Sequence, residues 1–161
     1  MNIDAKKIVL ELIDTFKIAG DLSIKLRKDG LIKEIKKDNT PVTNGDIEVN
    51  KILTEKISKV TPNIPIVSEE TSVNKNKVNL KNFWLIDPID GTSDYIDNKD
   101  EFTLNAALII NNKPALGLIN APAKKRIFYS YGPKNSFEII NNKEIKLSDK
   151  LKKNNEEIVA V

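Results

Sequence analysis

Apolar positions near the N-terminus repeat with the spacing of an α-helix. They fall at positions 5, 8, 9, 12, 13, 16, 19, 22 and 26, which are the three- and four-residue steps that place side chains on one helical face. This spacing predicts one long amphipathic helix over residues 3–27. A second helix is predicted over residues 44–59, because Pro41 and Thr43 form a start signal before it. The inner face of this second helix would carry Val49, Ile52, Leu53, Ile57 and Val60.

Beyond the second helix the apolar residues form short runs, which are typical of strands. Residues 64–67 and 83–86 are predicted as strands, the second one buried because its run is continuous. Polar residues 71–81 between them are expected to form a loop, and residues 31–37 form a further candidate strand. The paired asparagines at 111–112 and 141–142 are turn signals. An antiparallel meander is therefore predicted, with strands at 102–110, 115–120, 126–131 and 136–140.

Helices first and a meander later predict a layered α+β domain. We expect two long helices packed on a largely antiparallel sheet, all within one lobe of residues 1–150. Residues 141–155 are polar and rich in Lys and Asn, whereas residues 156–161 resemble the beginning of a new buried strand. This change predicts that residues 151–161 begin a second lobe.

Composition excludes several classes of protein. The 161 residues include 26 basic and 23 acidic ones, a net charge of +3 that is too balanced to favour a nucleic acid polymer as partner. The absence of Cys and His excludes a disulfide scaffold and the commonest zinc ligands, so any metal would be held by oxygen. The sequence shows no apolar segment typical of a signal peptide or a membrane span. A cytoplasmic protein without membrane insertion is expected.

The strongest chemical signal is the stretch Trp-Leu-Ile-Asp-Pro-Ile-Asp-Gly-Thr at residues 84–92. An apolar strand delivers Asp87 and Asp90, and the turn residues Gly91 and Thr92 follow at once. Hard divalent cations such as Mg²⁺ bind clustered carboxylate and carbonyl oxygens. Backbone N–H groups at the turn suit a phosphate oxygen. A tight turn is the alternative interpretation, but burying two carboxylates without a cation would be costly.

Three further acidic residues lie at the start or end of predicted elements. Asp46 lies three residues after Thr43, so it could complete a capping box at the start of the second helix. Glu69 and Glu70 close the first short strand and could be an ordinary solvated pair. Each position has a structural reading beside the functional one, and the local sequence leaves both open.

Four segments in the same order resemble the inositol monophosphatase superfamily of Mg²⁺-dependent, lithium-sensitive phosphatases. Residues 84–92 look like its signature, residues 38–46 resemble its D-x-S/T-P-V-T-x-A-D element, and residues 65–70 resemble its P-I-x-S/G-E-E element. Residues 100–105, Asp-Glu-Phe-Thr-Leu-Asn, are similar to the G-E-F-T-V-N stretch of the 3′(2′),5′-bisphosphate nucleotidase branch. The resemblance implies a layered α/β sandwich of the sugar-phosphatase type.

The resemblance also implies a metal site and its ligands. Glu69, Asp87 and the backbone carbonyl of Ile89 would hold a first Mg²⁺. Asp87 would bridge to a second Mg²⁺ that is joined by Asp90, and the family uses two or three such ions.

Substrate binding and water activation are implied in the same way. Asp46 and the Thr92 hydroxyl would polarise a water for in-line attack on phosphorus. A small phosphorylated substrate is implied, namely adenosine 3′,5′-bisphosphate, which would give AMP; an inositol or sugar monophosphate is the alternative. The family is often dimeric, which leaves a homodimer open. The residues implied to contact the substrate phosphate are Glu69, Ile89, Asp90, Gly91 and Thr92.

This sequence departs from the family pattern in three places. Gly45 replaces the usual Ala before Asp46, and Ser93, Asp94 and Tyr95 stand where the nucleotidase branch usually has Lys-Glu-Phe. Family members also continue into a second lobe with a W-D-x-A-A element, whose Asp completes the second metal site. This sequence lacks that element, so a catalytically inactive fragment is a third hypothesis.

Overall fold

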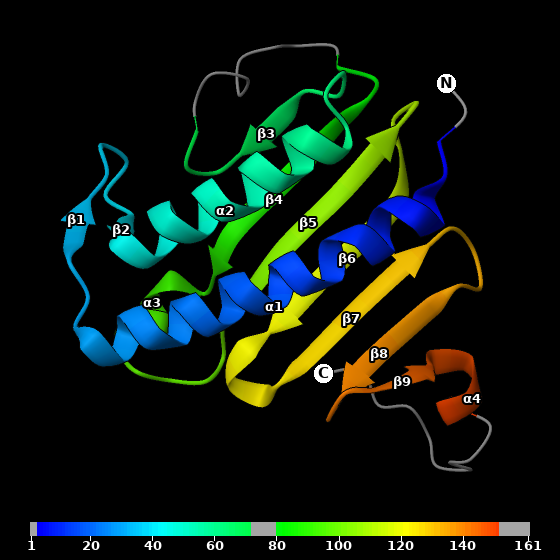
Figure 1. Cartoon of the computed structure of the whole chain (residues 1–161). Helices are drawn as coiled ribbons and strands as arrows, with labels where there is room; N and C mark the ends of the chain where they lie inside the picture. The colour runs from blue at the N-terminus through cyan, green and yellow to red at the C-terminus, as the bar shows by residue number, and fades with distance from the viewer. Residues whose placement is uncertain (1–2, 72–79, 152–161) are drawn as a thin grey trace.

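Two long helices lie side by side across one face of a seven-stranded sheet (Figure 1). The computed structural model describes residues 3–71 and 80–151 of the chain. Helix α1 spans Ala5–Asp29, and α2 spans Asn44–Val60. None of the helices in these two ranges combines the length and the apolar character needed to cross a membrane.

The large sheet has the strand order β3-β4-β5-β6-β7-β8-β9, and the β3–β4 pair is parallel while the other pairs are antiparallel. A separate two-stranded sheet precedes α2. Its strands are β1 (Lys33–Ile35) and β2 (Pro41–Thr43). The strands of the large sheet are β3 (Ile66–Ser68), β4 (Phe83–Asp90), β5 (Thr103–Ile110), β6 (Lys113–Ala121), β7 (Arg126–Tyr131), β8 (Ser136–Ile140) and β9 (Lys143–Lys146).

The hydrophobic core lies between the helices and the sheet. Helix α1 packs on β6 and β7, whereas α2 packs on β4. Trp84 is fully buried there, and its indole N–H donates to Thr61 Oγ1 at 2.9 Å, which fixes the end of α2 to the start of β4. Neither α1 nor α2 covers the opposite face of the sheet, and Leu85 and Ile119 remain about half exposed on it. The layered α+β architecture with two helices on a largely antiparallel sheet is confirmed.

Both long helices form where the sequence predicts them, with small changes at the ends. Helix α1 begins at Ala5 instead of residue 3, because the Asp4 side chain accepts a hydrogen bond from the Lys7 backbone N–H at 3.0 Å and caps the helix. It continues to Asp29 instead of residue 27, and Gly30 follows with φ of 103°, a conformation that ends a helix. The end of α2 differs by one residue from the prediction.

The predicted meander is confirmed, including two strands with the predicted bounds, β7 and β8. Both asparagine pairs have φ of 50° and 60°, the left-handed values that a two-residue hairpin turn requires. The strand predicted over residues 31–37 is wrong at both ends, since only Lys33–Ile35 pair with β2. The strand predicted over 64–67 is shifted, because Ile64 N–H donates to Thr61 O in a turn and pairing begins at Ile66.

Several elements were not predicted from the sequence. The polar stretch 141–155 contains β9 and helix α4 (Leu147–Leu151), and charged residues suit β9 because it lies at the edge of the sheet. Helix α3 (Thr92–Ile96) and the 3₁₀ turn η2 (Pro122–Lys124) were also missed. Most of the loop predicted over residues 71–81, and the strand predicted over 156–161, lie outside the described residues.

Candidate metal and phosphate site

A β-bulge places Asp87 and Asp90 on the same face of the sheet. Strict alternation would put residues three positions apart on opposite faces. Asp87 pairs with Asn105, and Asp90 pairs with Thr103. Strand β4 therefore advances three residues over the distance in which β5 advances two. Pro88 lies within this bulge, where the lack of an N–H is tolerated. Strand β4 therefore continues beyond the predicted end at residue 86 and presents both carboxylates to one side.

Glu69 reaches the same place through the parallel β3–β4 pair. Ser68 pairs with Ile86, and the Glu69 backbone N–H donates to Ile86 O at 3.1 Å, which sets Glu69 beside Asp87. Ser68 is fully buried, and its hydroxyl donates to Asn50 Oδ1 on α2 at 2.6 Å. The end of β3 is thus fixed to α2, and Glu69 is fixed with it.

Asp46 caps α2 and also contacts Thr92. It lies at the start of α2 and is only 1% exposed. Its Oδ2 accepts hydrogen bonds from the Thr43 backbone N–H at 2.7 Å and the Thr43 hydroxyl at 2.6 Å, which completes the capping box. Its other oxygen, Oδ1, lies 3.2 Å from the Thr92 hydroxyl. Capping therefore uses one carboxylate oxygen and leaves the second directed at Thr92.

The turn after β4 requires glycine. Gly91 has φ of 88°, and a β-carbon there would lie 2.8 Å from the Glu101 carbonyl oxygen. Gly91 is the N-cap residue of α3, and the first turn of this helix closes where Tyr95 N–H donates to Gly91 O at 2.9 Å. The Thr92 hydroxyl lies 3.0 Å from Ile89 O as well as near Asp46. The predicted catalytic pair and the predicted carbonyl ligand are therefore in contact.

The carboxylates share one electrostatic environment. Burial, followed by repulsion from Glu69, Asp90 and Asp46 and a hydrogen bond with Glu69, raises the pKa of Asp87 to about 7. A carboxyl group with this pKa keeps its proton below about pH 7, and a bound cation could replace that proton. The acidic residues from three elements thus lie near enough to repel one another.

Lys36, on the turn between β1 and β2, supplies a positive charge to this group. Its ammonium donates to Glu69 Oε1 at 3.0 Å and to Glu70 Oε1 at 2.7 Å, and these contacts outweigh partial burial and raise the pKa of Lys36. Within residues 3–71 and 80–151, no three acidic side chains converge as closely as bound-metal ligands do. The ion pair with Lys36 is one reason, because it directs Glu69 and Glu70 toward the hairpin.

The donor set nevertheless fits a hard cation. Every donor is an oxygen, and Asp87 Oδ1 is buried with no hydrogen-bond partner among the described residues. Asn105 Oδ1 is the other buried side-chain atom of this kind in the same part of the chain. Unsatisfied buried acceptors next to repelling carboxylates are what a divalent cation and its waters would satisfy.

Sequence reasoning gave no role to Lys36 or Asn105. Lys36 lies in a run of lysines, and only the hairpin shows which one turns toward Glu69. Asn105 was part of a recognised segment, but its contact with Asp90 depends on the bulge. No local pattern in the sequence could have identified either residue.

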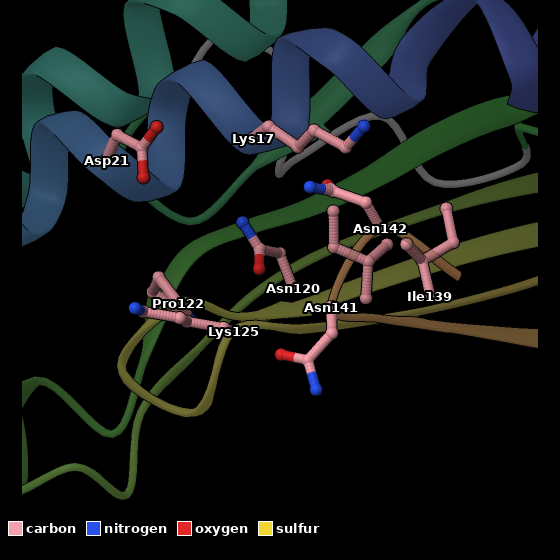
Figure 2. Close-up of a pocket in the computed structure, with 9 residues that line it drawn as sticks. Lys17, Asp21, Asn120, Pro122, Lys125, Ile139, Asn141 and Asn142 are labelled. Atoms are coloured by element: carbon pink, nitrogen blue, oxygen red, sulfur yellow. The ribbon is translucent and has the colours of Figure 1, made fainter. Parts of the chain in front are cut away.

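A separate polar cavity of about 470 Å³ lies between α1 and the ends of β6, β7 and β8 (Figure 2). Lys17 and Asp21 approach it from the helix, and Asn120 and Asn142 from the sheet side. None of the predicted site residues lines it. It is therefore distinct from the acidic site.

Comparison with known proteins decides which family has this arrangement. Residues 4–161 match the inositol monophosphatase family. The chain belongs to the inositol monophosphatase family. Within this family it is similar to the 3′(2′),5′-bisphosphate nucleotidase CysQ of Haemophilus influenzae, with 44% identity over 100 residues that cover 60% of this chain and 37% of the relative. CysQ of Aggregatibacter actinomycetemcomitans is 31% identical over 150 residues, covering 92% of this chain and 56% of the relative.

A solved structure of the family shares the fold. An IMPase/NADP phosphatase complexed with Mg²⁺ and phosphate superposes with a TM-score of 0.72 at 20% identity, covering 84% of this chain and 51% of that protein. The chain thus spans about half the length of that structure and 37% to 56% of the two CysQ relatives. The expected sugar-phosphatase type of layered fold is confirmed.

Proposed function

We propose that this chain carries the metal and phosphate site of a Mg²⁺-dependent phosphatase that removes the 3′-phosphate of adenosine 3′,5′-bisphosphate to give AMP. The observation that carries the proposal is the contact between the Thr92 hydroxyl and Asp46 Oδ1 at 3.2 Å, beside the repelling pair Glu69 and Asp87. The identity with two CysQ nucleotidases supports the choice of substrate, and the bound Mg²⁺ and phosphate of a protein with the same fold support the choice of ligands.

Glu69, Asp87, Asp90 and the carbonyl of Ile89 would hold Mg²⁺, which would lower the pKa of a bound water and neutralise charge on the phosphate. Asp46 and Thr92 would act on the attacking water. Asp46 is held in one orientation by Thr43, so its Oδ1 can accept a proton while the Thr92 hydroxyl aligns the water oxygen.

The bond changes follow from this arrangement. The water oxygen forms a bond to phosphorus as its proton passes to Asp46 Oδ1. The bond from phosphorus to the ribose 3′-oxygen breaks, and that oxygen takes a proton from solvent. Backbone N–H groups of the turn at Gly91 and Thr92 would bind the phosphate oxygens. Histidine, the usual general base, is absent from the sequence, so a buried carboxylate takes this role.

The test is phosphate release by the 161-residue chain with and without Mg²⁺. We expect release from adenosine 3′,5′-bisphosphate that needs Mg²⁺, that is lost in Asp87→Asn, and that exceeds release from inositol 1-phosphate. Faster turnover of inositol 1-phosphate would replace the proposed substrate with the alternative one. Binding of Mg²⁺ without release from either compound, even at high protein concentration, would reject catalysis by this chain.

A further inference from the structure

Asn105 lies between the two aspartates of the candidate site. It is the third residue of β5 and pairs with Asp87 on β4. Its Nδ2 donates to Asp90 Oδ2 at 3.1 Å. Because an ionised carboxylate only accepts hydrogen bonds, this contact places the amide nitrogen toward Asp90 and the amide oxygen away from it. One side chain thus contacts one candidate ligand and neighbours the other.

The amide oxygen of Asn105 has no partner of its own. Among the described residues, Asn105 Oδ1 and Asp87 Oδ1 are the buried side-chain oxygen or nitrogen atoms that lack a hydrogen bond. Asp87 and Asn105 also line one cavity of about 510 Å³ on the face of the sheet away from α1 and α2. Two unsatisfied acceptors on paired residues need both a positive charge and a hydrogen-bond donor. A hydrated divalent cation supplies both.

The bulge at Pro88 makes this arrangement possible. Without the extra residue in β4, the Asp90 side chain would lie on the opposite face of the sheet from Asn105. With it, Asp90 retains Oδ1 for a cation while Asn105 holds Oδ2. The amide therefore limits the rotation of Asp90 about its side-chain bonds.

We propose that Asn105 is a positioning residue of the metal site, which orients Asp90 through Nδ2 and accepts a hydrogen bond from a water on the divalent cation through Oδ1. This inference rests on the proposed function, because it requires that Asp87 and Asp90 bind a cation. Side chains that orient metal ligands in this way commonly change metal affinity by about 10- to 100-fold when they are replaced.

The test compares Asn105→Leu with the wild-type chain in two measurements. Calorimetric titration with Mg²⁺ should give a dissociation constant about tenfold or more higher for Asn105→Leu. Thermal unfolding without metal should show a melting temperature that is unchanged or raised, because Leu has a similar shape and removes a buried acceptor that has no partner. A merely structural role for Asn105 predicts the reverse pattern, a lower melting temperature with unchanged Mg²⁺ affinity.

Two further variants keep the result interpretable. Asn105→Ala adds no bulk and should weaken Mg²⁺ binding in the same direction if Asn105→Leu fails to fold. Asn82→Leu is the matched control, since Asn82 precedes the other end of β4 and its side chain accepts a hydrogen bond from Asn111 N–H at 2.8 Å. Its Mg²⁺ affinity should equal that of the wild-type chain.

The outcomes separate this inference from the proposed function. If the wild-type chain binds Mg²⁺ no better than Asp87→Asn does, the metal site itself is rejected and the role of Asn105 with it. If the wild-type chain binds Mg²⁺, Asp87→Asn does not, and both Asn105 variants bind within twofold of wild type, the role of Asn105 alone is overturned.

Discussion

The hydroxyl oxygen of Tyr95 lies 2.6 Å from the position that a β-carbon on Gly45 would occupy. The same hydroxyl donates to Ser23 O on α1 at 2.6 Å, which holds the ring in place. The family pattern has Ala where this chain has Gly45, and its nucleotidase branch usually has Phe where this chain has Tyr95. The two departures noted in the sequence are therefore in contact, and each accommodates the other next to Asp46.

Gly45→Ala should destabilise the protein by about 1–2 kcal/mol, because overpacking costs about 1–3 kcal/mol and the gain in helix propensity offsets only part of it. Adding Tyr95→Phe should recover much of the loss, since a ring without the hydrogen bond to Ser23 can shift. Urea denaturation of both single variants and the double variant measures the coupling. Gly117→Ala is the control, as its nearest neighbour atom would lie 3.7 Å away. Strictly additive effects of the two changes would contradict the compensation.

The raised pKa of Asp87 predicts an unusual pH dependence for the metal-free protein. Between the usual aspartate pKa of about 3.9 and about 7, the folded protein keeps a proton on Asp87 that the unfolded chain has released. The folded state then binds more protons, so this stabilising contribution is complete at low pH and is lost as the pH rises through 7. Asp87→Asn lacks this titration.

Urea denaturation at pH 5 to 8 in the presence of a chelator tests this expectation. The stability of Asp87→Asn relative to wild type should rise by about 2 kcal/mol across this range, less than the full pKa shift implies, because Asp87 is only partly buried and solvent screens it. Saturating Mg²⁺ should remove the difference in pH dependence by keeping Asp87 ionised in the folded wild-type chain. Parallel stability curves for the two proteins without metal would contradict the assignment.

Lys36 competes with a divalent cation for Glu69. Its ammonium lies 3.0 Å from Glu69 Oε1, where it repels a cation that approaches the same carboxylate. Lys36→Met keeps most of the side-chain length without the charge, and it should lower the dissociation constant for Mg²⁺ about tenfold, equivalent to about 1.4 kcal/mol. Calorimetric titration measures this change, and Lys37→Met controls for the loss of a nearby exposed charge. Equal or weaker binding by Lys36→Met would show that Lys36 supports the metal site instead.

Removal of the Thr92 hydroxyl should separate catalysis from metal binding. Thr92→Val keeps the shape of the side chain but loses the contacts with Asp46 and Ile89 O, so phosphate release should fall about 100-fold or more while Mg²⁺ affinity changes little. Thr92→Ser retains the hydroxyl and should keep most of the activity. Initial rates at saturating Mg²⁺ measure the effect. Full activity in Thr92→Val would remove Thr92 from the proposed mechanism.

The sequence predicted those parts of the fold that have a repeating signal. Helix α1 and the meander follow from apolar periods of about 3.6 and 2 residues, and the asparagine turns follow from their preference for positive φ. Strand β9 has no such signal, because Lys143 and Glu144 are exposed and its pairing depends on β8. Tertiary pairing decided this element.

The candidate site was predictable as a set of residues but not as an arrangement. Motif spacing indicated Asp87 and Asp90, yet spacing alone would have placed them on opposite faces of a regular strand. Likewise, the partners Lys36 and Asn105 are distant in sequence from the carboxylates they contact. Strand pairing between segments distant in sequence sets these contacts, and local sequence patterns do not predict that pairing.

The bulge also makes the length of the Asp-Pro-Ile-Asp segment a stricter requirement than its composition. Replacing Ile89 by another apolar residue leaves the alternation of the chain unchanged. Deleting one residue between the aspartates would let regular pairing replace the bulge, with the second aspartate still on the same face but with the carbonyl that the Thr92 hydroxyl contacts moved from its place. Inserting one residue while the bulge is kept would turn the second carboxylate to the opposite face of the sheet. Insertions or deletions between Asp87 and Asp90 should therefore abolish function more often than a substitution at Ile89, which keeps the segment four residues long.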